Sequence, residues 1–410
     1  MSARPLTRDL AVDLAVIGGG FTGCAAALYA AQSGASVCLL EAETIGHGGS
    51  GRNVGLVNAG LWLPPETVIA QMGQVEGLHL IRALAGAPAQ VFDLIAREGI
   101  DCEATHNGTL HLAHSAAGLR DLQDRHRQGV ALGAPLQLLD ATETARRVGS
   151  DRFFGALFDP RAGTIQPLAY VRGLARAALA AGASVHMQSP VTALTRQNGV
   201  WVLHSQGHEL RARTLLVATN AYHHWLHAPF QPQFVPVHYC QYATDPLPEA
   251  LRHAILPGGE GCWDTALVMS SLRLDKAGRL VLGGIGNGEG PLGGVHDAWA
   301  QRKLAALFPA LKGQVWQHGW SGRIAMTGDH IPKLVAFGPD ALACFGYSGR
   351  GIGPGTVFGT QAAQALLTGN MQGLPVAPVT QHAEHFTSAR ALWYETGATV
   401  VHAGAARFNR

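Results

Sequence analysis

The chain has 410 residues, of which only 14% are charged, and its formal net charge is +2. This length predicts two domains or lobes with a large buried core, and the weak net charge excludes the basic surface of a nucleic-acid-binding protein. The six cysteines are scattered without a CxxC pair, so we expect neither disulfides nor a metal site, and a reducing, cytoplasmic location.

The first predicted elements are a strand, a glycine-rich turn and a helix. Residues 14–17 form a short apolar run, and the alanine-rich segment after the turn predicts a helix that ends at Gly34. Gly18, Gly20 and Gly23 fit the pattern G-x-G-x-x-G, in which bare backbone lets a pyrophosphate approach the N-terminus of the helix.

A second predicted strand, residues 36–40, ends at an acidic residue. Glu41 lies 18 residues beyond the last glycine of the motif, a spacing typical of a carboxylate that accepts hydrogen bonds from a ribose diol. The strand, the glycine turn, the helix and the acidic tip together predict a dinucleotide-binding site. The residues that we assign to it are Gly18, Gly20, Phe21, Thr22, Gly23, Glu41 and Ala42.

Two further glycine-rich segments favour FAD over NAD, which is the alternative dinucleotide. Residues 46–60 directly follow the acidic strand, and a strand at 342–345 leads into a glycine loop, 346–355, and a helix. An NAD site needs little beyond the first unit, whereas the N-terminus of the late helix is suited to the negative charge of a reduced flavin. The residues assigned to FAD here are Gly49, Ser50, Gly51, Arg52, Asn53, Gly55, Leu56, Val57, Gly349, Arg350, Gly351, Ile352 and Gly353.

The ordered set of motifs resembles the D-amino-acid-oxidase superfamily of FAD-dependent amine and amino-acid oxidoreductases. The likeness covers nearly the whole chain and comprises VIGGGFTG with Glu41, GGSGRN, PVTALTRQNGVWVL, LRARTLLVATNAY, GWSGRIAMTGDHIP and GYSGRGIG. The segment SGRN is most similar to the gamma-glutamylputrescine oxidase branch. The resemblance implies that Val191 contacts the adenine and that Ala218, Thr219 and Asn220 contact FAD, with Asn220 in place of the commoner glycine.

The element pattern and the resemblance predict an α/β fold with a discontinuous Rossmann-type FAD-binding domain. The second, α+β substrate domain is expected to contain an antiparallel or mixed sheet, because residues 235–248 and 272–284 show the alternation of half-buried strands. The expected FAD-binding domain comprises residues 1–87, 166–221 and 329–410, and the expected substrate domain comprises residues 88–165 and 222–328.

Hydride transfer from an amine to a flavin requires that the protein hold the neutral amine against the ring, so we expect no nucleophile–base pair. In the family, glycine-oxidase-like members carry a carboxylate-binding Arg at the position of Ile324, and the neighbouring Arg323 points to the opposite face of its strand. Sarcosine-oxidase-like members carry a loop Lys at the position of Gly353 and a flavin-linking Cys near Gly322. The resemblance therefore implies noncovalent FAD and a primary amine or polyamine conjugate as substrate.

Three side chains are candidates for contact with the reacting groups: Arg350, Trp320 and Tyr347. Arg350 either contacts the flavin edge or a substrate carboxylate, or points to the surface from its turn. Arg52 is a second candidate to bind an anionic group of the substrate.

Other residues have simpler explanations. Trp62 and Trp263 fit an aromatic amine pocket, but plain core packing is the better explanation for both. Asp329 and His330 suggest an acid/base pair, yet the resemblance implies that the Asp braces its strand. His47 is expected to be an ordinary loop residue rather than a covalent flavin link.

The sequence thus predicts an enzyme that transfers a hydride from the carbon beside an amine nitrogen to flavin N5 and releases an imine that water hydrolyses. Oxygen or another acceptor would reoxidise the flavin. The alternatives are the FAD-binding subunit of a heteromeric amino-acid dehydrogenase, an oxidase of a secondary or cyclic amino acid, and a noncatalytic FAD-binding module. The polar N-terminus and the glycine-broken apolar stretch at 14–40 predict no membrane span, and the oligomeric state stays open.

Overall fold

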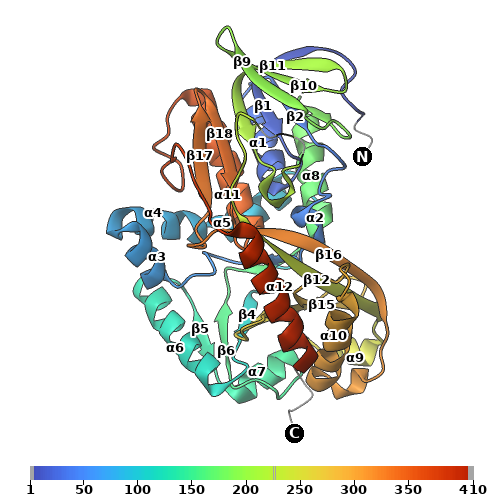
Figure 1. Ribbon diagram of the computed structural model, residues 1–410. Coiled ribbons are helices and arrows are strands. Elements are labelled where there is room, and N and C mark those ends of the chain that lie inside the picture. Colours follow the sequence, from blue (N-terminus) through green and yellow to red (C-terminus); the bar gives the residue numbers. More distant parts are fainter. Residues whose placement is uncertain (1–3, 225, 227, 405–410) are drawn as a thin grey trace.

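The computed structural model describes residues 4–224, 226 and 228–404. The protein has two halves, and the chain passes between them repeatedly (Figure 1). The half that carries the glycine motif lies at the top of Figure 1, and the half below it is built on a second sheet.

The upper half contains an eight-stranded sheet with a parallel centre. The apolar runs of its central strands are buried because both faces of the sheet are covered. In spatial order its strands are β17 (Lys333–Gly338), β18 (Ala341–Phe345), β11 (His208–Val217), β1 (Leu10–Ile17), β2 (Val37–Leu40) and β8 (Ser184–His186), with β10 (Val200–Ser205) and β9 (Ala193–Gln197) attached through β11.

Three helices pack together over one face of this sheet, and their close approach depends on glycine. They are α1 (Phe21–Gln32), α8 (Pro167–Ala180) and α11 (Ile352–Thr368). A Cβ on Gly23 would lie 1.9 Å from the carbonyl oxygen of Gly18, and one on Gly359 would lie 2.1 Å from the carbonyl oxygen of Thr22. Neither distance is sterically possible, so these two glycines allow α1 to contact both the strand turn and α11.

The lower half contains a second eight-stranded sheet. Its neighbouring strands are antiparallel except for one parallel pair, as the alternation in the sequence predicts. In spatial order they are β16 (Trp316–Met326), β12 (Val235–Pro246), β15 (Arg279–Ile285), β14 (Ser270–Leu274), β13 (Gly261–Asp264), β4 (Thr109–Leu112), β6 (Ala156–Asp159) and β5 (Gln137–Leu139).

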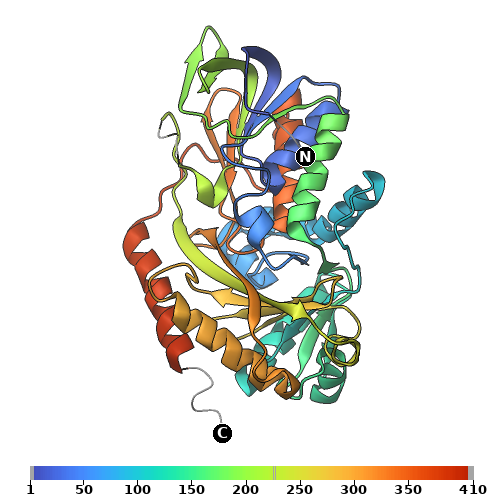
Figure 2. The same cartoon turned by 90° about the vertical axis from the view of Figure 1, so that its right-hand side faces the viewer.

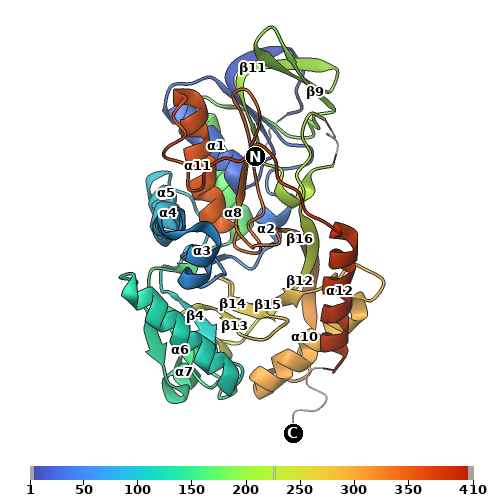
Figure 3. The same ribbon diagram turned by 60° about the vertical axis from the view of Figure 1, so that its left-hand side comes forward.

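Helices surround this second sheet and connect it to the first (Figure 3). Those of the lower half are α6 (Ala116–Ala131), α7 (Ala141–Val148), α9 (Glu249–Ala254), α10 (Gly293–Leu307), the 3-10 turn η2 (Pro309–Leu311) and α12 (Thr387–Gly404). Between the halves lie α2 (Gly49–Arg52), α3 (Pro65–Met72), α4 (Gln74–Ala85), α5 (Ala87–Arg97), the 3-10 turn η1 (Asn220–Tyr222) and the strand pair β3 (Leu56–Val57) and β7 (Gly163–Thr164).

Among the described helices, residues 74–97 are long and apolar enough, by length and composition, to cross a membrane. This segment forms two helices, α4 and α5, that meet at Gly86, and both contact α11. Packing against a core helix accounts for its apolar character.

The C-terminal helix differs from the expected arrangement. Residues 387–404 fall in the range predicted for the FAD-binding domain, but α12 packs on β12 and α10 of the lower half (Figure 2).

Two glycine segments also contain more helix than expected. Residues 49–52 form the short helix α2, and α11 begins at Ile352 instead of after Gly355. Pro354 is tolerated there because the first turn of a helix leaves its N–H groups unpaired.

Candidate functional site

A cavity of about 1060 Å³ lies between the two halves. It runs past the carboxyl ends of β1, β2 and β11, where ligands bind in open parallel sheets. Its far wall is the inner face of the second sheet.

The glycine turn after β1 forms one end of this cavity. Gly18 has φ +109°, and a Cβ there would lie 2.8 Å from the carbonyl oxygen of Ala218. Gly20 caps α1 without a side-chain hydrogen bond, and the N–H of Phe21 donates to Ser50 Oγ at 3.0 Å. Bare backbone and a helix N-terminus that face a cavity fit the pyrophosphate of a dinucleotide.

Glu41 lies at the tip of β2, beside the turn. Its Oε2 accepts from the N–H of Gly19 at 2.6 Å, and its Oε1 accepts from the N–H of Glu43 at 2.9 Å. Burial raises the pKa of Glu41, and these two N–H groups oppose that effect. Each oxygen keeps a lone pair, so the held carboxylate fits the ribose diol that the sequence predicts.

Arg52, in the glycine-rich segment 46–60, joins the two halves of the protein. Its guanidinium donates to the carbonyl oxygens of His47 at 2.7 Å and Ser321 at 2.9 Å. The side chain is therefore bound to protein, which leaves Arg350 as the better of the two predicted anion partners. Asn53 donates to the carbonyl oxygen of Gly49 at 2.9 Å and stabilises α2.

Trp320 is not where the prediction placed it. Its indole N–H donates to the carbonyl oxygen of Arg52 at 2.7 Å, and the side chain does not line the cavity. Because this bond holds the ring against α2, we assign Trp320 a structural role and no contact with a reacting group.

Tyr347 lines the cavity but its hydroxyl is engaged. It shares a 2.8 Å hydrogen bond with Thr22 Oγ1 and so connects the β18–α11 loop to α1. Burial raises the pKa of Tyr347 well above its usual value. The hydroxyl therefore stays protonated and positions the loop.

Arg350 faces the cavity and not the outer surface. Its Nη1 donates to the carbonyl oxygen of Ala59 at 2.9 Å, and its guanidinium carbon lies 5.0 Å from the centre of the Trp263 ring. Among the described residues no carboxylate pairs with it. Burial lowers the pKa of Arg350 to about 10, and the charge of Arg125 adds to that effect. Asp159 opposes the shift but is itself paired with Arg161.

Most of the predicted cofactor residues line the cavity. Asn220 has the left-handed φ of +45° that favours glycine, and its Oδ1 accepts from the N–H of Gly346 at 3.0 Å, which explains the asparagine. Four predicted cofactor residues do not line the cavity and act in backbone packing instead: Gly23, Gly51, Gly55 and Val57.

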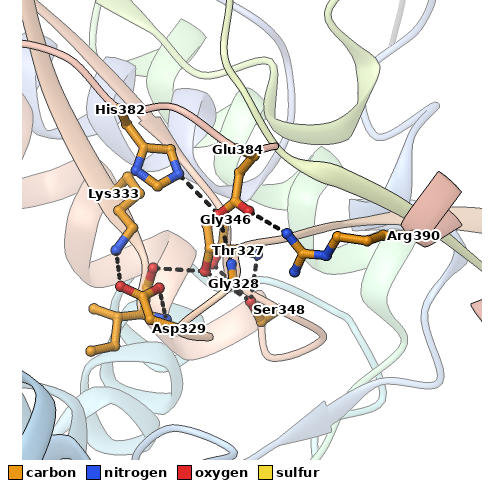
Figure 4. Close-up of polar contacts among 10 residues, drawn as sticks. Thr327, Gly328, Asp329, Lys333, Gly346, Ser348, His382, Glu384 and Arg390 are labelled. Carbon is orange, nitrogen blue, oxygen red and sulfur yellow. Dashed lines mark hydrogen bonds and ion pairs between the residues drawn. The ribbon is translucent and has the colours of Figure 1, made fainter. Parts of the chain in front are cut away.

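The loop between β16 and β17 is held by a polar cluster (Figure 4). Asp329 accepts from Lys333 and from the N–H of Ile331, which supports a bracing role over acid/base catalysis. Glu384 accepts from the N–H of Gly328 at 2.6 Å and from Arg390 at 2.6 Å. This cluster fixes the loop that places the neighbouring His330 on the cavity wall, where its ring contacts Trp62 edge-on.

The sequence analysis missed the cavity residues on β12, which are Val237, His238, Tyr239 and Gln241. Tyr239 and Gln241 both line the cavity, and Tyr239 lies over Gly322, where a Cβ would be 2.3 Å from its hydroxyl oxygen. Their spacing of two along a strand was the available signal, since alternate residues share a face. On the next strand, Arg323 stacks on Tyr222 and contacts His224, so it does not take the place of Ile324.

The cradle, the acidic tip and the second glycine loop define an FAD-dependent oxidoreductase, and the family model for "FAD dependent oxidoreductase" (DAO) matches residues 13–365. The chain belongs to this family. The predicted family, fold class, cofactor and enzyme class are confirmed.

Individual relatives match most of the chain. A probable oxidoreductase OrdL from Haemophilus influenzae is 30% identical over 370 residues, which cover 88% of this chain and 84% of that protein. The gamma-glutamylputrescine oxidoreductase of Escherichia coli is 30% identical over 359 residues, with coverages of 85% and 82%. The crystal structure of glycine oxidase from Geobacillus kaustophilus superposes with a TM-score of 0.76 at 20% identity, over 92% of this chain and 100% of that chain.

Proposed function

We propose that the enzyme oxidises an amine that carries an anionic group on an extended chain, such as a polyamine conjugate. The observation that supports this most directly is Arg350, a cation without a carboxylate partner among the described residues, on the cavity wall beside Trp263. A desolvated cation is stable only when an anion or strong acceptors compensate it. The similarity to the gamma-glutamylputrescine oxidoreductase of Escherichia coli supports a substrate of this kind.

In the proposed reaction, bound FAD supplies the hydride acceptor at N5. Arg350 would hold the anionic group, and Trp62 and Trp263 would supply apolar walls that favour the neutral amine over the ammonium. The amine nitrogen donates its lone pair as the α-C–H leaves as hydride, and water hydrolyses the imine. The Tyr347–Thr22 hydrogen bond keeps the loop of Arg350 in place.

We further propose noncovalent FAD, the predicted cofactor residues that line the cavity, and the domain ranges given above, with α12 assigned to the substrate domain. The resemblance places the flavin-linking cysteine of sarcosine oxidases near Gly322, and the absence of a cysteine there supports noncovalent binding. The cytoplasmic location also stays a proposal, and the six free, buried cysteines support it.

The test is anaerobic reduction of the bound flavin by matched amines with and without a carboxylate. We expect the flavin absorbance to bleach, and to do so at lower concentration with the carboxylate-bearing amine of each pair. Equal half-saturating concentrations for the two amines of a pair would contradict the anion site. If no amine bleached the flavin absorbance, the proposed amine oxidation would be contradicted.

A further inference from the structure

A row of residues crosses the second sheet beneath the cavity. The register pairs Gln241 on β12 with Gly283 on β15, Gly283 with Ser271 on β14, and Ser271 with Trp263 on β13. Directly paired residues on neighbouring strands point to the same face. Gln241, Ser271 and Trp263 all line the cavity, so the row forms its floor.

Gln241 is a buried amide that has no hydrogen-bond partner in the described part of the chain. The residue is 4% exposed, and no described residue bonds its Oε1. A buried polar group left without a hydrogen bond costs about 1–3 kcal/mol, so an unpaired amide in a cavity indicates a group that is bound there. The indole N–H of Trp263, at the other end of the row, is likewise buried without a partner.

Gly283 makes room for this amide. A Cβ on Gly283 would lie 2.3 Å from Gln241 Oε1 and 2.3 Å from the carbonyl oxygen of Cys240. The side chain of Gln241 therefore lies over the bare backbone of β15. From there to β13, which carries Trp263, is two strand spacings, about 10 Å, and the guanidinium carbon of Arg350 lies 5.0 Å from the centre of the Trp263 ring.

We infer that Gln241 is a specificity-determining residue, whose amide hydrogen-bonds a polar group in the middle of the substrate while Arg350 holds the anionic end. The inference rests on the proposed amine oxidation and deepens it. The substrate it describes has an anionic group and a hydrogen-bonding group, such as an amide, separated by a stretch of chain that crosses the floor of the cavity from Gln241 to Trp263 and Arg350. An all-methylene chain of the same length would leave the Gln241 amide unsatisfied, and sites built around such groups discriminate strongly against analogues that lack the partner.

The experiment compares two probes of equal length, an amine joined to a carboxylate through an amide-containing chain and its all-methylene analogue. Binding to the oxidised holoenzyme is measured by perturbation of the flavin spectrum, and reduction is measured separately under anaerobic conditions. We expect the wild type to bind the amide probe roughly tenfold more tightly. Gln241→Met should abolish that preference, and its melting temperature should stay unchanged or rise because an unsatisfied amide is removed.

Gln361 on α11 provides a matched control, because its Oε1 is also buried with no partner among residues 4–224, 226 and 228–404, but the residue does not line the cavity. Gln361→Met should keep the wild-type preference. If the Gln241→Met protein does not fold, Gln241→Leu replaces it as the test variant. Equal binding of both probes by the wild type, or a preference that survives at Gln241→Met or Gln241→Leu, would overturn the inference. If the preference behaves as expected but neither probe reduces the flavin, the inference stands and the proposed amine oxidation fails.

Discussion

Replacement of Arg350 by Met should separate ligand binding from folding. Removal of the guanidinium takes away a charge-assisted hydrogen bond to the substrate anion, worth about 1.5–3 kcal/mol, so the half-saturating concentration of a carboxylate-bearing amine should rise roughly 10- to 100-fold. Amines without an anionic group should be affected far less. The measurement is anaerobic flavin reduction against substrate concentration, which gives the limiting rate and the half-saturation separately.

The stability of the same variant follows from the burial of the charge. A pKa lowered to about 10 corresponds to about 3 kcal/mol against the charged form, from burial together with the charge of Arg125. The variant also loses the hydrogen bond to Ala59 and the contact with Trp263, together about 2–3 kcal/mol. The unfolding free energy should therefore change by less than about 1 kcal/mol.

Arg213→Met is the control for Arg350→Met, because Arg213 pairs with Asp13 away from the cavity lining. Its half-saturating concentration should match the wild type. If Arg350→Met binds carboxylate-bearing amines like the wild type, or loses several kcal/mol of stability, the reasoning about an unpaired cavity cation is refuted.

Gly23→Ala should prevent formation of FAD-containing protein, because its Cβ would lie 1.9 Å from the carbonyl oxygen of Gly18; the measurement is the flavin-to-protein absorbance ratio after purification. Tyr347→Phe should lower the unfolding free energy by about 1 kcal/mol, because Thr22 loses its partner; thermal melts of the single and double variants check this. For Glu384, burial raises the pKa, but its hydrogen bonds outweigh that and leave the pKa lowered. Its contribution to stability is therefore present above the ordinary pKa of a Glu and is lost as pH falls through the lowered value. Glu384→Gln should flatten the decline of the unfolding midpoint between about pH 5 and pH 3.

The controls for these changes come from the same chain. A Cβ on Gly294, in α10, would have no heavy atom within 4 Å. Gly294→Ala should therefore leave the protein as stable as the wild type or slightly more stable. A Gly23→Ala protein with full flavin content, an unchanged melt for Tyr347→Phe, or a wild-type acid profile for Glu384→Gln would each contradict the corresponding contact.

The first fold unit was predictable because its chemistry is local. A strand, a glycine turn and a helix follow one another within residues 10–32, and the carboxylate of Glu41 lies at the next strand tip. The second sheet was predictable in kind, since alternation marks half-buried strands. Its order was not, because pairing of β13 with β4 joins segments about 150 residues apart in the chain, and no local pattern records that.

The side chains of the site were harder to predict than the backbone contacts. Trp320 occupies the expected strand, but its indole reaches the backbone of Arg52, a partner that only the tertiary structure shows. Gln241 escaped notice because a single glutamine in an apolar strand gives no motif. Its importance depends on the absence of a hydrogen-bond partner and on the bare backbone of Gly283 beside it. Likewise, α12 lies on β12 although its sequence follows the FAD-binding segment.

The repeated passage of the chain between the halves has a consequence for how the enzyme can be dissected. A protein whose domains follow one another can be cut at a linker. Here β4 of the second sheet lies along the chain between β1 and β11 of the first, and β12 to β16 of the second sheet lie between β11 and β18 of the first. Neither half corresponds to one contiguous fragment, so separate expression of the halves would divide each core. We expect limited proteolysis to yield nicked protein that still migrates as one body in its native state, with the flavin retained until both sheets unfold together.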